Sequence, residues 1–121
     1  MSRILIVDDS GLARRSTRRI LEDAGFDVVE AVDGMSALEQ YFVQKPDAVL
    51  LDLVMKGMYG LEVLERLREM DPDVRVIVVS ADIQTSSRDL VTSAGAAGFL
   101  NKPVEGPALV AAVRSVLGLG D

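Results

Sequence analysis

The sequence predicts an α/β fold: a doubly wound, five-stranded parallel sheet flanked by five helices. Short apolar runs rich in β-branched residues recur along the chain, as buried strands do in such sheets. Stretches with helical periodicity lie between and after these runs. Strands that alternate with helices in this way are typical of an open parallel sheet covered on both faces.

Five apolar runs are the candidate strands. They are residues 4–7, 28–31, 48–51, 76–79 and 98–100. Each is far shorter than the ~20 residues that a membrane-spanning helix needs. Two aspartates directly follow the first run, which is unlike a signal peptide. We therefore expect a cytoplasmic protein with no membrane segment.

Helices are expected between and after these runs, and boundary residues mark several of them. They are Ser10 before the first helix, Gly25 after it, Asp33 and Gly34 at the start of the second, and Pro46 and Pro72 after the second and third. The fifth helix ends near Leu117, and residues 118–121 form a short tail. We expect one domain, residues 1–121, with no output domain after it.

Composition excludes several classes of function. The chain of 121 residues has a net charge of −6, which disfavours direct binding to nucleic acid. It contains no histidine and no cysteine, which rules out Ser-His-Asp triads, cysteine nucleophiles, disulfides and zinc clusters. Any chemistry must come from carboxylates, hydroxyls and lysine.

Polar residues collect where the predicted strands end. Asp8 and Asp9 follow the first run, Asp52 the third and Ser80 the fourth, while Asn101 and Lys102 follow the fifth. Ligands of such sheets bind outside the carboxyl ends of the strands. Doubly wound sheets commonly have the strand order 2-1-3-4-5; this order is a property of the fold class, and it makes the first and third strands neighbours.

That neighbourhood brings together three carboxylates, Asp8, Asp9 and Asp52. Their repulsion is tolerable only if a pKa rises or a cation binds. Mg²⁺ is the natural choice, because it prefers oxygen ligands and typically combines carboxylates with a phosphate. With Lys102 as a fixed positive charge, the group is suited to phosphoryl transfer to a carboxylate.

Four segments of the chain resemble the response-regulator receiver domains of two-component signalling systems, which are CheY-like. The segments are ILIVDDS at residues 4–10, LLDLVMKGMYG at residues 50–60, VSA at residues 79–81 and GFLNKP at residues 98–103. The resemblance covers essentially the whole chain. It implies a phosphoaspartate switch that receives its phosphoryl group from a sensor histidine kinase or phosphotransfer protein and controls an unknown downstream protein.

The resemblance also implies roles for individual residues. They are Asp52 as phosphoacceptor, Asp9, Asp52 and the Val54 carbonyl as Mg²⁺ ligands, Asp8 as a ligand partly through water, Ser80 and Lys102 as contacts of the phosphoryl group, Phe99 as a switch aromatic, and Pro103 after a cis peptide. Such a protein catalyses its own phosphorylation and dephosphorylation without being an enzyme in the usual sense. Its signalling face is formed by the fourth helix, fifth strand and fifth helix.

The chain departs from the family pattern beside Asp52. Lys56 stands where proline is usual, and with Gly57 it is expected to loosen or recharge the loop after Asp52. Val54 replaces a residue that is frequently polar, next to the path of the water that removes the phosphoryl group. Asp82 borders the same path. We expect slow loss of the phosphoryl group.

Other interpretations remain open for single features. Asp8 and Asp9 alone suit a turn and a helix start, and Lys102 alone suits a surface position. Four arginines at positions 14, 15, 18 and 19 are interpreted first as a solvated helix face and second as a docking site for an acidic partner.

Three other functions are alternatives to the switch. A haloacid-dehalogenase-type phosphatase needs an aspartate where Val54 stands, and a flavodoxin-like binder needs a phosphate loop where Asp8 and Asp9 stand. The serious alternative is a receiver fold that is never phosphorylated and acts purely as a protein-interaction module.

Overall fold

The computed structural model describes residues 2–55, 59–81 and 85–119, with backbone alone for residues 85–87. The expectations for Lys56, Gly57 and Asp82 lie outside the described residues. Strands and helices alternate as predicted. In chain order the elements are β1 (Arg3–Val7), α1 (Gly11–Asp23), β2 (Asp27–Ala31), α2 (Gly34–Gln44), β3 (Ala48–Asp52), α3 (Gly60–Met70), β4 (Val76–Ser80), α4 (Thr85–Ser93), β5 (Gly98–Asn101) and α5 (Gly106–Val116).

All four strand pairings of the sheet are parallel, and the strand order is β2-β1-β3-β4-β5. This confirms the predicted fold class and order. Val7 at the end of β1 pairs with Leu51 of β3. The residues that follow them, Asp8 and Asp52, therefore lie at the same edge of the sheet.

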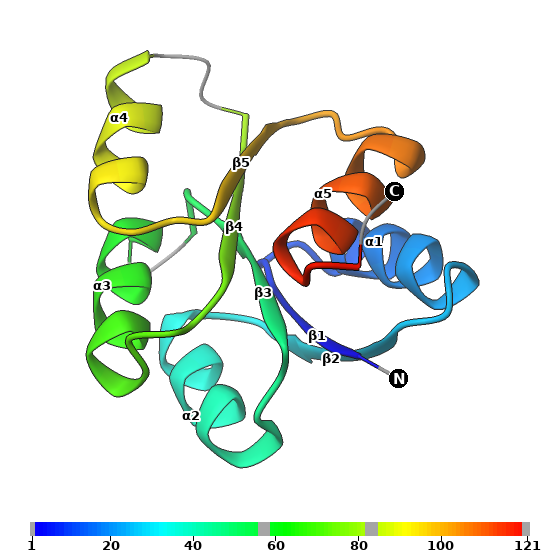
Figure 1. The fold of residues 1–121 in the computed structure, drawn as a ribbon, viewed down its shortest axis with the longest axis horizontal. Coiled ribbons are helices and arrows are strands. Elements are labelled where there is room, and N and C mark those ends of the chain that lie inside the picture. The colour runs from blue at the N-terminus through cyan, green and yellow to red at the C-terminus, as the bar shows by residue number, and fades with distance from the viewer. Residues whose placement is uncertain (1, 56–58, 82–84, 120–121) are drawn as a thin grey trace.

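Two apolar cores lie on opposite faces of the sheet, because successive side chains of a strand point to opposite sides. Leu5 and Val7 of β1 belong to the core shared with α2 and α3, whereas Ile4 and Ile6 belong to the core shared with α1 and α5. Figure 1 shows α1 and α5 on one face and α2, α3 and α4 on the other. The sheet interior is therefore buried from both sides, and its carboxyl edge is left for polar groups.

The predicted caps are confirmed at the first two helices. Ser10 accepts a hydrogen bond from the backbone N–H of Ala13, and Asp33 accepts one from Ser36. Gly25 follows α1 with a φ of 94°, a left-handed conformation that glycine adopts without strain. These contacts satisfy donors that a helix leaves unpaired at its ends.

Three strands extend one residue past their apolar runs and include the polar residue that follows. Asp52, Ser80 and Asn101 are the last residues of β3, β4 and β5. The backbone ladder is indifferent to side-chain polarity, so an apolar run underestimates the strand. None of the helices in the described part of the chain has the length and apolar character to cross a bilayer.

Candidate active site

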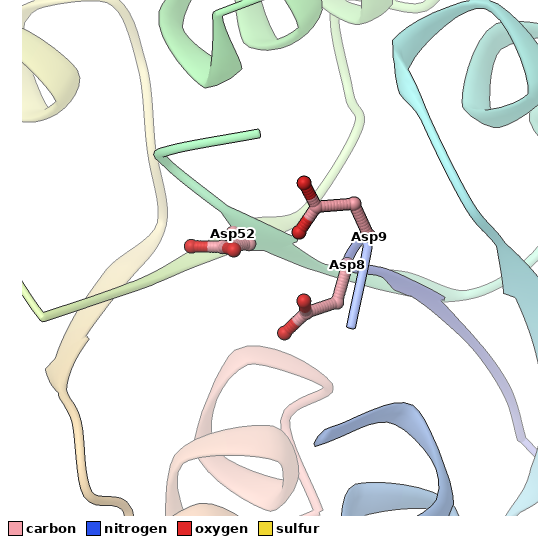
Figure 2. A group of neighbouring side chains, drawn as sticks. All are labelled: Asp8, Asp9 and Asp52. Atoms are coloured by element: carbon pink, nitrogen blue, oxygen red, sulfur yellow. The ribbon is translucent and has the colours of Figure 1, made fainter. Parts of the chain in front are cut away.

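Three carboxylates gather at the carboxyl ends of β1 and β3. Figure 2 shows Asp8, Asp9 and Asp52 side by side, and one carboxylate oxygen of each lies within 4.8 Å of the others. Asp8 is 7% exposed and Asp52 is 8% exposed, while Asp9 is open to solvent. The predicted acidic cluster is therefore present, with two carboxylates buried and one at the surface.

The donor chemistry of this cluster fits a hard divalent cation. Carboxylate oxygens are the ligands that Mg²⁺ takes, and the exposed Asp9 leaves room for the waters that Mg²⁺ keeps. The backbone N–H of Val54 donates to Oδ1 of Asp52 at 3.3 Å, so the backbone of that residue lies beside the cluster. Asp8, Asp9 and Asp52 are thus close enough to serve one ion, with the backbone of Val54 next to them.

Lys102 supplies the positive charge of the site. Its Nζ lies 3.0 Å from Oδ2 of Asp8 and 3.7 Å from Oδ2 of Asp52. Burial alone lowers the pKa of Lys102, but the hydrogen bond to Asp8 and the charges of Asp52 and Asp8 outweigh it and raise the pKa. The lysine therefore stays charged, and its ammonium lies closer to Asp8 than to Asp52.

The surroundings of Asp52 disfavour its ionised form. Burial raises its pKa most, Asp8 and Asp9 raise it further, and the opposing effects of Lys102 and the Val54 N–H are insufficient. A carboxylate in this state gains from any additional cation. The electrostatics therefore favour cation binding next to Asp52.

The turn after β1 is held by hydrogen bonds on both sides. The backbone N–H of Ser10 donates to Oδ1 of Asp8 at 2.9 Å, and that of Asp8 donates to the Ala31 carbonyl at 3.2 Å. The carboxylate of Asp8 is thus fixed by its own turn as well as by Lys102. Asp9 follows in the same turn and carries the exposed carboxylate.

The remaining predicted residues lie at the ends of β4 and β5. Ser80 is fully buried, and its carbonyl accepts a hydrogen bond from the Lys102 backbone at 2.8 Å. Phe99 is half-buried and packs against the core on the α2 and α3 face, with the guanidinium of Arg88 5.9 Å from its ring centroid. The Lys102–Pro103 peptide is cis.

A cavity of about 460 Å³ opens beside the cluster. Asp8, Asp52 and Lys102 line it together with Ile20 of α1 and Leu109 of α5, among others. The two buried carboxylates are therefore reachable from outside.

Sequence reasoning missed a steric requirement at Gly60. A Cβ at this position would lie 2.6 Å from the Cα of Leu53 and 2.7 Å from the carbonyl oxygen of Asp52. The Gly60 N–H donates to the Leu53 carbonyl at 2.9 Å, which holds α3 against the end of β3. Gly60 lies within the segment quoted for the family resemblance, so only its role was missed.

The arginine patch on α1 corrects an expectation. Arg15 and Arg19 are exposed, as a solvated helix face requires. Arg14 and Arg18 instead turn toward β2 and form ion pairs with Glu30. The interpretation of all four arginines as a solvated face is therefore wrong for Arg14, whose side chain is 17% exposed, and holds only in part for Arg18, whose side chain is 39% exposed.

Comparison with protein families gives one match over most of the chain. The family described as the response regulator receiver domain matches residues 4–114. Among curated proteins, the response regulator MprA of Mycobacterium ulcerans (strain Agy99) is 40% identical over 115 residues, which is 95% of this chain and 50% of MprA. The chain thus spans about half the length of the curated relatives it matches.

Solved structures show the same fold. A response regulator receiver domain protein (CheY-like) from Methanospirillum hungatei JF-1 has a TM-score of 0.93 and 28% identity, covering 98% of this chain and 95% of that one. A chain of the CheX–CheY–BeF3–Mg²⁺ complex from Borrelia burgdorferi has a TM-score of 0.91 and 31% identity, covering 95% and 88%.

Proposed function

The chain belongs to the response regulator receiver domain family, and from that premise we propose that it is a Mg²⁺-dependent switch phosphorylated on Asp52. The observation that supports this most is the position of Asp52: buried, beside two other carboxylates, with a lysine ammonium 3.7 Å away. A cluster built only for stability has no reason to combine these features.

The proposed reaction is transfer of a phosphoryl group to a carboxylate oxygen. An oxygen of Asp52 forms a bond to phosphorus while the bond from phosphorus to the donor breaks, and the donor takes the bonding electron pair. The donors are phosphohistidine of a sensor kinase or phosphotransfer protein, or a small acyl phosphate. Bound Mg²⁺ would neutralise charge on the phosphoryl oxygens.

Each residue of the site has a distinct task in this proposal. Asp9, Asp52 and the Val54 carbonyl hold Mg²⁺ directly, and Asp8 assists partly through water. Lys102 exchanges part of its contact with Asp8 for the phosphoryl group, which the 3.0 Å and 3.7 Å distances allow with little movement. Ser80 donates a hydrogen bond to a phosphoryl oxygen. The chain then catalyses its own phosphorylation and dephosphorylation.

The downstream effect of phosphorylation is proposed to pass through β4 and β5. Ser80 pairs with Asn101, and Phe99 lies two residues before Asn101 on the same strand. Movement of Ser80 toward the phosphoryl group gives Phe99 space to become more buried, which alters the face formed by α4, β5 and α5. Pro103 lies where this face meets the site. The altered face then binds a downstream protein, with the cytoplasm as the expected compartment.

Nuclear magnetic resonance can test this coupling. Addition of Mg²⁺ and beryllofluoride, which stands in for the phosphoryl group, should shift amide signals across residues 98–113 as well as those of the acidic cluster. Signals that change only around Asp8, Asp9 and Asp52 would show that the switch does not reach β5.

Intact-protein mass spectrometry tests the central proposal. Incubation with acetyl phosphate and Mg²⁺ should add the mass of one phosphoryl group, and excess chelator should prevent the addition. A chain that folds and binds Mg²⁺ but gains no mass under any of these conditions would instead be an interaction module with a receiver fold.

A further inference from the structure

One arginine of α1 connects three elements beside the acidic cluster. Nη1 of Arg14 donates to the backbone carbonyl of Asp8 at 2.7 Å, and Nε donates to Glu30 of β2 at 2.9 Å. The Arg14 side chain is 17% exposed, so these contacts are shielded from water. A planar guanidinium with donors in fixed directions is suited to hold two acceptors at once.

The carbonyl that Arg14 binds belongs to the peptide unit that joins Asp8 to Asp9. Because a peptide unit is planar, a fixed carbonyl also fixes the N–H on its other side. With this peptide plane fixed, the bonds at the Cα of Asp9 are the next ones along the chain that can still rotate. Arg14 thereby restricts the Asp9 side chain to the directions that rotation about its own N–Cα and Cα–Cβ bonds can reach.

Glu30 is held in turn by a second arginine. Arg18 forms an ion pair with the other carboxylate oxygen of Glu30 and donates to the Val28 carbonyl at 3.2 Å. The carboxylate that orients Arg14 therefore has little freedom of its own. This arrangement reaches from β2 through α1 to the turn that carries two of the candidate metal ligands.

We propose that Arg14 is a positioning residue for Mg²⁺, acting through the Asp8 carbonyl to fix the Asp8–Asp9 turn; this rests on the proposed function. Charge and positioning predict opposite effects of Arg14 on the affinity for Mg²⁺. Arg14 is a cation near a cation site, so by charge alone it opposes Mg²⁺ binding. By positioning it favours binding, because ligands held in place lose less freedom when the ion binds.

The direction in which Arg14→Gln changes the Mg²⁺ affinity therefore distinguishes the two effects. Loss of a positive charge alone should tighten Mg²⁺ binding, whereas loss of positioning should weaken it. We expect Arg14→Gln to raise the Kd of Mg²⁺ about tenfold, measured by isothermal titration calorimetry on the whole chain. Arg15→Gln removes the same charge from an exposed neighbour on the same helix, and should leave the Kd unchanged or lower it.

Two further variants separate positioning from general loss of structure. Arg14→Lys keeps the charge but not the fork of donors, and Glu30→Gln removes the carboxylate that orients the guanidinium; both should raise the Kd less than Arg14→Gln does. A purely structural role for Arg14 would lower the melting temperature while the folded variants kept the original Kd. If Arg14→Gln does not fold, Arg14→Lys still separates the two effects, because it keeps the positive charge and loses the fork of donors.

The outcomes distinguish this inference from the proposed function. An unmutated chain that does not bind Mg²⁺ would overturn the metal dependence of the proposed function and this inference with it. Normal Mg²⁺ binding by the unmutated chain, together with an unchanged or lower Kd in the folded Arg14 variants, would overturn this inference alone.

Discussion

Asp52 and Glu30 are two carboxylates in ion-pair networks, and their surroundings affect them in opposite ways. Burial raises the pKa of both. At Glu30, hydrogen bonds from Arg18 and Arg14 outweigh burial, and the pKa falls below its usual range. At Asp52, Asp8 and Asp9 add to burial, Lys102 compensates only in part, and the pKa rises.

The negative charge of Glu30 is balanced by neighbouring arginines, whereas the negative charges around Asp52 are balanced only in part. Glu30 has two arginines for one carboxylate, whereas Asp52 shares Lys102 with Asp8 and lies beside a third carboxylate. A network of the first kind stabilises the fold. One of the second kind lowers stability and is characteristic of sites that bind or react. The two networks are joined through Arg14, which binds both Glu30 and the backbone carbonyl of Asp8.

The largest effect expected from this difference is that substitutions of Asp52 and Glu30 change the stability of the fold in opposite directions. Without Mg²⁺, Asp52→Asn should raise the free energy of unfolding by about 1 kcal/mol, because a buried charge among like charges is removed. Glu30→Gln should lower it by about 1 to 2 kcal/mol, allowing for partial exposure of the ion pairs. Urea unfolding of the two variants and the parent chain measures both changes.

Two changes of condition serve as controls for this pair. Saturating Mg²⁺ should stabilise the parent chain more than Asp52→Asn, since a ligand stabilises only the state that binds it. Low pH should reduce the difference between Glu30→Gln and the parent. The pKa of Glu30 is lowered by folding, so its stabilisation is present above the unfolded-state pKa and is lost as the pH falls through the folded-state pKa. If both variants changed stability in the same direction without Mg²⁺, the proposed difference between the two networks would be wrong.

A smaller effect is expected at Val54, which tests whether this side chain limits attack of water on the phosphoryl group. Val54 is 60% exposed next to Asp52 and has no polar group to orient an attacking water. One neutral hydrogen bond contributes ~0.5–1.5 kcal/mol, so Val54→Asn should speed loss of the phosphoryl group by roughly twofold to tenfold. The decay of phosphorylated protein in Mg²⁺ after donor removal gives the rate.

A matched substitution controls for the general effect of asparagine. Val43 of α2 is 61% exposed, and Val43→Asn should leave the decay unchanged. Equal decay of Val54→Asn and the parent chain would mean that Val54 does not limit access of water.

The sequence was sufficient to predict most of the fold, because its signals are local. Apolar runs located all five strands, and Ser10, Gly25 and Asp33 marked helix ends correctly. Strand ends were placed one residue early at Asp52, Ser80 and Asn101. A hydrophobic pattern stops at the first polar side chain, while the hydrogen-bond ladder of the backbone does not.

The site was predictable in composition but not in its contacts. The three aspartates and Lys102 follow from their places at strand ends once the strand order is known. The side chain of Lys102 donates to Asp8, 94 residues away, and Arg14 pairs with Glu30, 16 residues away. No local pattern encodes such pairs, because they depend on how α1 and the turn after β5 pack on the sheet. The steric need for Gly60 is equally invisible without the backbone of Leu53 beside it.

The most direct test of the account is the identity of the phosphoacceptor. The parent chain, Asp52→Asn and Asp23→Asn, which changes an exposed carboxylate at the end of α1, would be incubated with acetyl phosphate and Mg²⁺ and compared by intact mass. We predict one added phosphoryl group on the parent and on Asp23→Asn, and none on a folded Asp52→Asn. Labelling of Asp52→Asn at the rate of the parent chain would contradict the account.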